Sequence, residues 1–426
     1  MTGLQSSNAW RLLGALTLAY VLSFLDRQFL AVAVEPVRGE LGLSDVQLGL
    51  LAGLAFAVFY SILGVPMGVL SDCISRTKLI AACIALWSIA TACCGLSRNF
   101  NELFVARMFV GIGEAGLLPA AYSLIGDRFE RAYIPQATGL FVAGAALGNG
   151  LAVLGGGPLI EMLPPIGEFA SWRQIFLGLG AAGIVIALVI LQIPDRRIVV
   201  SQASGAAKKD AASLFAFLRA NIGFLLPIAL GASLLNIFFY GNFAWTPAFF
   251  ARTHSWDGTQ VGLTYGMCIL AGGIAAGPLW GRIGTIINQR GGDLIGFLII
   301  AAIGPLLLIS AVGALSPSPW VSVFLLGSIP LVSGGFIALV PALLVERTPA
   351  ALRGQIMALF FLCTNISGIG FGPLIYAWTT QNILGGPEKL GQSLAIVSPI
   401  LLLAAGCLYW LSRGALIRSS QSFISN

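Results

Sequence analysis

Four charged residues interrupt two otherwise hydrophobic segments of the sequence. Asp26 and Arg27 are neighbours in one segment, and Arg107 and Glu114 occupy another. Charges buried in such surroundings cost enough free energy that they mark an ion, proton or ligand pathway by default. Arg107 and Glu114 are seven residues apart, so on a helix they share a face, two turns apart. Asp26 and Arg27 point about 100° apart on a helix, so we expect them to contact different partners.

A buried carboxyl group of this kind can either form an ion pair with an arginine or hold a proton. Burial raises the pKa of a carboxyl group and a neighbouring arginine lowers it, so a buried carboxylate can gain a proton when its arginine is drawn away. We therefore assign proton coupling to Asp26, Arg27 and Glu114. Arg107 belongs to the same charge network and would orient Glu114 or a helix end. The alternative is that the four charges form a permanent salt-bridge lock that binds neither proton nor substrate.

The composition indicates a membrane protein. Of its 426 residues, 57% are hydrophobic and 9% are charged, whereas soluble domains contain about 25% charged residues. Polar residues separate twelve hydrophobic runs, each long enough to cross about 30 Å of hydrocarbon. The predicted runs are 10–34, 46–70, 79–97, 102–125, 134–158, 173–194, 221–250, 259–281, 294–314, 319–345, 355–378 and 391–412.

The distribution of positive charge predicts the orientation of these runs. If the N-terminus is cytoplasmic, sixteen lysines and arginines lie in cytoplasmic segments and five lie outside. This bias predicts that both termini are cytoplasmic, as is the polar linker 195–219. The linker separates an N-terminal set of six helices, residues 1–194, from a C-terminal set, residues 220–426. Because topology accounts for the net charge of +6, nucleic acid is not expected as a partner.

The two halves resemble each other at equivalent loops. Residues 126–140, "GDRFERAYIPQATGL", align without a gap with residues 345–359, "VERTPAALRGQIMAL". The alignment pairs Asp127 and Arg128 with Glu346 and Arg347. Internal duplication of this kind is typical of transporters that work by alternating access.

The loop after the second run carries a family signature. In "GVLSDCISR", residues 68–76, Gly68, Asp72 and Arg76 match the pattern G-x-L-x-D-x-x-G-R-[KR] of the major facilitator superfamily, although Ser75 replaces its second glycine. "LDRQ" in the first run, together with "RMFVGIGEAGLLPAAYSLIGDRF" in the fourth, resembles the spinster-type facilitators, which are sphingolipid and lysolipid transporters. The resemblance implies an all-α fold of two six-helix bundles related by a pseudo-twofold axis, working as a monomer.

The resemblance also implies the positions of a cavity and a gate. The first and fourth runs would line the central cavity, so Arg27 could reach Glu114. We expect the substrate to contact both residues together with aromatic, phenol and amide side chains, namely Tyr60, Tyr122, Phe239, Asn242, Trp245 and Asn365. The conformational gate would lie on the cytoplasmic loops and comprise Gly68, Asp72, Arg76, Asp127, Arg128, Glu346 and Arg347.

The predicted function is secondary transport in a bacterial inner membrane. The expected partners are protons, membrane lipids and an amphiphilic anion such as a lysolipid or sphingoid phosphate. The alternative is a facilitator or exporter of a soluble organic anion or a drug-like amphiphile, because an arginine selects charge better than shape. An enzyme is not expected, since the one histidine, His254, and seven scattered cysteines form no catalytic or metal-ligand pattern. No metal or cofactor is predicted.

Overall fold

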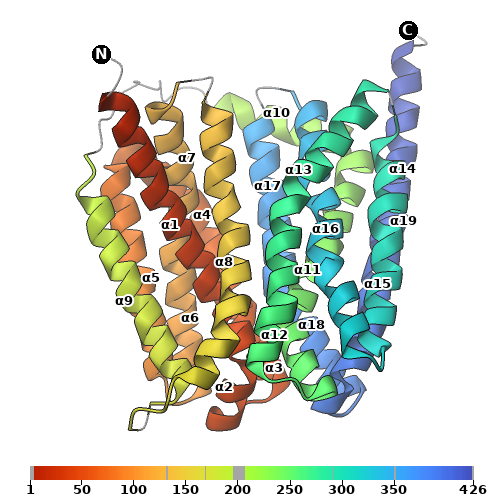
Figure 1. Ribbon diagram of the computed structural model, residues 1–426. Helices are drawn as coiled ribbons and strands as arrows, with labels where there is room; N and C mark the ends of the chain where they lie inside the picture. The colour runs from red at the N-terminus through yellow and green to blue at the C-terminus, as the bar shows by residue number, and fades with distance from the viewer. Residues whose placement is uncertain are drawn as a thin grey trace.

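The computed structural model describes residues 4–130, 133–167, 169–194, 207–290, 292–349 and 352–424. These residues form two bundles of helices that stand side by side (Figure 1). The first helix begins and the last helix ends at the same end of the molecule, which we call the terminal end (Figure 1). This placement agrees with an even number of spans.

The N-terminal bundle contains nine helical segments. They are α1 (Leu4–Val32), α2 (Val34–Leu41), α3 (Asp45–Ala52), α4 (Leu54–Cys73), α5 (Arg76–Leu96), α6 (Phe100–Glu114), α7 (Leu117–Arg128), α8 (Ile134–Met162) and α9 (Ser171–Leu191). One further helix, α10 (Ala207–Ala220), follows, while residues 195–206 of the predicted linker lie outside the described residues.

The C-terminal bundle contains the remaining segments, several of them π-helical. They are α11 (Ile222–His254), α12 (Gly258–Val261), η1 (Gly262–Gly266), α13 (Met267–Gln289), α14 (Leu294–Leu298), η2 (Ile299–Ile303), α15 (Gly304–Leu315), α16 (Pro319–Arg347), α17 (Arg353–Asn365), η3 (Ile366–Phe371), α18 (Gly372–Trp378), η4 (Thr379–Ile383), η5 (Pro387–Lys389) and α19 (Leu390–Ile424). Four of these, η1 to η4, are π-helical turns inside spans.

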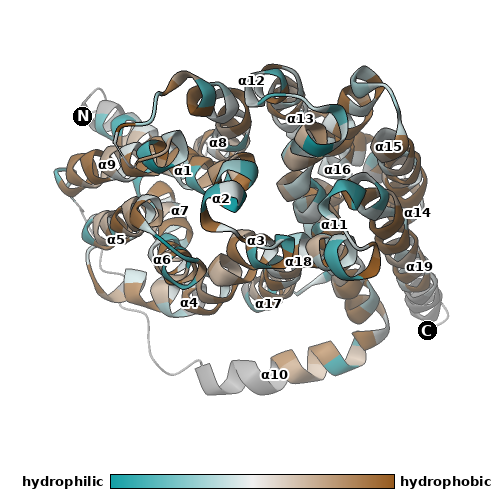
Figure 2. Cartoon of the chain, turned by 90° about the horizontal axis from the view of Figure 1, so that it is seen from below, coloured by the Kyte–Doolittle hydropathy of each residue, from teal (hydrophilic) through white to brown (hydrophobic). Residues whose placement is uncertain are grey.

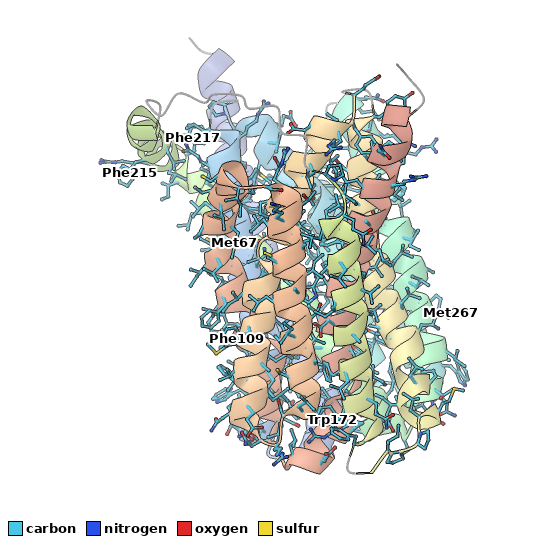
Figure 3. All side chains as sticks on the ribbon, turned by 90° about the vertical axis from the view of Figure 1, so that its left-hand side faces the viewer. Met67, Phe109, Trp172, Phe215, Phe217 and Met267 are labelled. Atoms are coloured by element: carbon cyan, nitrogen blue, oxygen red, sulfur yellow. The ribbon has the colours of Figure 1, made fainter. Side chains whose placement is uncertain are left out.

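All twelve predicted spans are confirmed in the described part of the chain, each as one helix or a series of consecutive helical segments long and apolar enough to cross a membrane. Two spans in the first bundle are broken. The second span passes from α3 to α4 at Gly53, and the fourth passes from α6 to α7 at Ala115 and Gly116. Large hydrophobic side chains such as Phe109 and Met267 are exposed on the outside of the bundles, where lipid would contact them (Figure 3).

The two bundles meet closely at the end opposite the termini. There α8 packs against α12, η1 and α13, while α3 packs against α18. Glycines allow this approach: a Cβ atom on Gly53 would lie 2.5 Å from the carbonyl oxygen of Gly370 in the other bundle. Seen along the spans, polar residues gather around the junction of the bundles and hydrophobic residues cover much of the periphery (Figure 2).

Candidate functional site

The break in the fourth span positions Glu114. This residue is the last of α6, and the flanking glycines let α6 press against α5. A Cβ atom on Gly113 would lie 2.6 Å from the backbone nitrogen of Trp87, so a larger residue would push the helices apart. The carboxylate of Glu114 faces α1.

Glu114 forms an ion pair with Arg27. Its Oε2 atom accepts a hydrogen bond of 2.6 Å from Nε of Arg27 and one of 2.5 Å from the hydroxyl of Ser23. The Nη2 atom of Arg27 contacts the same oxygen. Within the described residues, nothing donates a hydrogen bond to the second oxygen, Oε1. The side chain of Glu114 is 0% exposed and that of Arg27 is 14% exposed, so the arginine is the partner that water can reach.

Three aromatic rings surround the guanidinium group of Arg27. Its Cζ atom lies 4.7 Å from the ring centroid of Phe24, 4.4 Å from that of Phe56 and 4.6 Å from that of Tyr60. Distances of this order allow cation–π attraction, which is strongest where water is excluded. The rings fix the arginine in place and give the site an apolar wall.

Asp26 and Arg107 form a second, separate pair. Oδ1 of Asp26 lies 3.9 Å from Nη1 of Arg107, and Oδ2 accepts a hydrogen bond from the hydroxyl of Thr91. Both charged side chains are buried. Arg107 also donates from Nε to the carbonyl of Leu51, 3.4 Å away, near the end of α3. Of the two roles left open for Arg107, the structure favours contact with a helix end, and Asp26 and Arg27 do face different partners.

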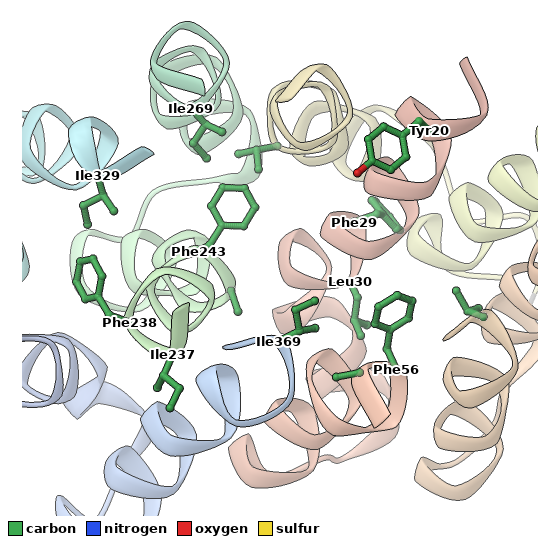
Figure 4. Packing of buried hydrophobic residues seen from close by; sticks show 14 of the residues in the cluster. Tyr20, Phe29, Leu30, Phe56, Ile237, Phe238, Phe243, Ile269, Ile329 and Ile369 are labelled. Carbon is green, nitrogen blue, oxygen red and sulfur yellow. The ribbon is translucent and has the colours of Figure 1, made fainter. Parts of the chain in front are cut away.

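A cavity of about 70 Å³ lies between the bundles beside Arg27. That volume holds a few water molecules. The N-terminal bundle contributes Arg27, Gln28 and Phe56 to its wall, and the C-terminal bundle contributes Phe239 and Ile369. Phe56 and Ile369 lie together where the bundles meet (Figure 4).

Gln28 links the two bundles at this cavity. Pro247 lies inside α11. Because proline has no N–H group, it cannot donate a hydrogen bond to the carbonyl of Phe243 four residues earlier. The side-chain nitrogen of Gln28 donates to this carbonyl instead, at 3.3 Å. Gln28 lies within "LDRQ", but no role was predicted for it; the proline four residues after Phe243 was the signal that a donor from elsewhere is needed.

The other predicted substrate residues take different positions relative to the cavity. Phe239 lines the cavity, Tyr60 stacks against Arg27, and Tyr122 is 44% exposed on α7. Asn365 is half-buried at the end of α17.

Asn242 and Trp245 do not line the cavity described above, and their contact with the substrate stays a prediction. Asn242 is buried in the C-terminal bundle, where its amide nitrogen lies 2.9 Å from the hydroxyl of Tyr376. The indole nitrogen of Trp245 donates to the carbonyl of Pro373 at 2.8 Å. Buried polar groups in a lipid environment need such partners, so both side chains turn inward toward neighbouring helices.

Some of the predicted gate residues contact one another. Nη1 of Arg76, at the start of α5, lies 2.5 Å from Oδ2 of Asp127, near the end of α7, and it also donates to the hydroxyl of Ser123. Arg128 donates to the carbonyl of Pro194 after α9. These contacts tie the terminal ends of three helices together.

The other predicted gate residues lie in α4 and α16. Gly68 lies in α4, where a Cβ atom would meet Pro119 at 3.8 Å. Asp72 also belongs to α4, but its side chain lies outside the described part of the structure. Glu346 and Arg347 are exposed at the end of α16. Since α7 ends at Arg128 and α16 at Arg347, the duplicated motifs occupy equivalent helix ends.

The structure reveals an ion-pair cluster that the sequence reasoning missed. Arg252 of α11 lies 2.6 Å from Oε1 of Glu35 and 2.8 Å from Oδ2 of Asp45, so it joins the C-terminal bundle to α2 and α3. The carboxylate of Glu161 likewise binds the backbone nitrogens of Gly258 and Thr259 across the bundles. We call the contacts of Arg252 with Glu35 and Asp45 the Arg252 latch. It closes the end opposite the termini.

The family follows from a sequence match. The sequence profile of the Major Facilitator Superfamily matches residues 16–373. The chain belongs to this superfamily. The facilitator is therefore a transporter and a multi-pass integral membrane protein, not an enzyme.

Individual relatives carry varied substrates. The chain is 25% identical over 408 residues to an MFS-type efflux pump of Mycolicibacterium smegmatis, covering 95% of this chain and 92% of that protein. It is 26% identical to a putative tartrate transporter of Agrobacterium vitis, covering 92% of each. Against protein spinster homolog 1 of Bos taurus the identity is 28%, over 59% of this chain and 48% of that protein.

The fold matches that of a bacterial spinster homologue. The crystal structure of a bacterial homolog to the human lysosomal transporter spinster, in an inward-facing and unoccupied conformation, superposes with a TM-score of 0.84. It covers 96% of this chain and 98% of that one, at 23% identity. The inward-facing and occupied form gives 0.78. The expected spinster-like architecture is confirmed.

Proposed function

We propose that this facilitator is a proton-coupled secondary transporter that moves an amphiphilic anion, such as a lysolipid or sphingoid phosphate, by alternating access across a bacterial inner membrane. One observation carries the proposal. Arg27 contacts a fully buried carboxylate on one side and a cavity between the bundles on the other.

The ion pair suits a competition between substrate and carboxylate. An anionic headgroup entering the cavity meets Arg27, the more exposed partner of the pair. As the headgroup draws the guanidinium toward itself, the carboxylate of Glu114 loses its counter-charge while it stays buried, which favours uptake of a proton. Substrate and proton then occupy the site together. Asp26, the second buried carboxylate, would take part in the same proton pathway because its partner Arg107 lines the same cavity as Arg27.

The walls of the cavity favour a ligand with an apolar part. Aromatic rings of both bundles line it, among them Phe24, Phe56 and Phe239. The Arg252 latch closes one end, so the substrate enters from the terminal end, where the Arg76–Asp127 contact lies. The excess of positive charge at this end indicates that it faces the cytoplasm.

The test uses purified protein in liposomes that contain a pH-sensitive dye. Lysolipids and sphingoid phosphates are added to wild type, to Glu114→Gln and to the control Glu102→Gln, whose carboxylate is exposed on the same helix. We expect at least one lipid to drive proton flux in wild type and in Glu102→Gln. Glu114→Gln should bind that lipid but move no protons. Equal flux in all three proteins would overturn the role of Glu114.

A soluble organic anion is the second candidate substrate. Relatives named for L-galactonate, sulfoacetate and tartrate support it, as does a cavity of about 70 Å³, which admits a headgroup and not a whole lipid in this conformation. The same liposomes answer this question when dicarboxylates and sugar acids replace the lipids. Flux with a sugar acid and none with any lipid would transfer the proposal to the soluble anion.

A further inference from the structure

The helix that joins the two bundles lies apart from them. Seen along the spans, residues 214–220 of α10 run lengthwise beside the bundles (Figure 2), and from the side the helix projects from the molecule at the terminal end (Figure 3). It therefore lies across the direction of the spans. Its bounds, Ala207–Ala220, give a length of about 21 Å at 1.5 Å per residue. It packs against the beginning of α11.

The sequence of α10 is amphipathic. At about 100° per residue, Leu214 and Leu218 fall on one stripe, with Phe215 and Phe217 on either side of it. Ala216 falls on the opposite face. The helix also carries Lys208, Lys209 and Arg219 against a single acidic residue, Asp210. An aromatic and aliphatic face combined with excess positive charge is typical of helices that lie in a membrane interface.

The apolar face is partly exposed, since Leu214, Phe217 and Leu218 are half-buried and Phe215 is exposed, and it adjoins the lipid-facing surface. Phe215 is 70% exposed and points away from the bundles (Figure 3). The next helix continues this surface, since Ile222 and Leu226 of α11 are also exposed large hydrophobic residues. Because α11 is a membrane span, its exposed hydrophobic side chains contact lipid. The apolar surface of α10 thus extends from a surface that lipid already covers.

We propose that α10 binds the surface of the bilayer, with Phe215 and its apolar neighbours inserted among the headgroups and the basic residues attracting anionic phospholipids. The excess of lysine and arginine selects anionic over zwitterionic headgroups, because each basic residue near an anionic surface adds to the attraction. The occupant is a lipid surface rather than a protein because α10 ends at Ala220, immediately before the membrane span Ile222–His254 begins, and its apolar surface continues onto that span. This inference does not depend on which substrate the facilitator moves.

Amide hydrogen exchange of the full-length protein in nanodiscs tests the proposal. Nanodiscs are made of phosphatidylcholine alone or with phosphatidylglycerol, and exchange is followed in peptides covering residues 207–220. We expect exchange to be about tenfold slower with phosphatidylglycerol, and the difference to shrink at high salt. Phe215→Asp should abolish the slowing. Ala216→Asp, which adds the same charge on the opposite face, should largely retain it.

Three results would overturn the proposal. One is the same exchange rate in both lipids for the wild-type protein, a comparison that needs no variant and so does not depend on folding of a mutant. The second is an equal effect of Phe215→Asp and Ala216→Asp, which would mean that charge alone, not the apolar face, matters. The third is slowing that appears only after cytosolic protein is added, which would assign the surface to a protein partner instead.

Discussion

At the scale of single residues, the four buried charges form two pairs with different surroundings. Arg27 and Glu114 lie beside the cavity, and the arginine keeps some contact with it. Asp26 and Arg107 are both buried, although Arg107 also borders the cavity. If the second pair is only a structural lock, removing both charges should preserve proton flux. If it belongs to a proton pathway, removing both charges should abolish the flux.

For this second pair we predict separate effects on stability and on transport. Asp26→Asn leaves Arg107 as a buried charge without its carboxylate and should lower the free energy of unfolding by about 3 kcal/mol. The double variant Asp26→Asn/Arg107→Met removes both charges and should recover most of that stability, measured by thermal unfolding in detergent. Proton flux in liposomes should be lost in both the single and the double variant. Recovery of flux together with stability would show that the pair is only a structural lock.

At the scale of helices, the bond from Gln28 to the carbonyl of Phe243 compensates for Pro247. In Gln28→Leu this carbonyl loses its donor, which costs about 1–3 kcal/mol in the conformation described here. We expect the end opposite the termini to open more often, detected as longer distances between spin labels placed on α2 and α12. Adding Pro247→Ala restores a backbone donor and should reverse the shift. A distance distribution unchanged by Gln28→Leu would contradict this role.

The helices show what could be predicted from sequence and what could not. Hydrophobic length alone gave all twelve spans, because a bilayer imposes that length on every crossing. Arg27 and Glu114 could be singled out from the sequence because charged residues within membrane spans are rare. The partners of Asn242 and Trp245 could not be predicted because an aromatic and amide pattern on α11 does not reveal which face turns toward the cavity. That choice depends on packing against α18 and α19.

Ion pairs at helix ends escaped prediction for a related reason. Arg252 lies 217 residues from Glu35 and 207 from Asp45, and charged residues are ordinary at helix ends. Nothing in their local pattern indicates that they meet. Their partnership arises only when the two bundles come together, which is a property of the whole molecule.

At the scale of the whole molecule, the Arg252 latch holds the two bundles together at one end. Alternating access requires this end to open, so the latch must break in each cycle. Arg252→Gln removes the charge that joins Glu35 and Asp45 and should raise the ratio of open to closed molecules about tenfold, which corresponds to about 1.4 kcal/mol. Distances between spin labels on the two bundles at this end would measure the change.

Arg173 provides a matched control for the latch. It is buried to a similar degree and lies 2.7 Å from Oε1 of Glu40, yet both residues belong to the N-terminal bundle. Arg173→Gln should lower thermal stability, because it also donates to the carbonyls of Gly95 and Ser97, but should leave the distances between bundles unchanged. If both variants opened the molecule equally, general loosening of the fold would explain the opening. If neither did, the glycine-mediated packing of α8 against α12 and α13 would by itself keep this end closed.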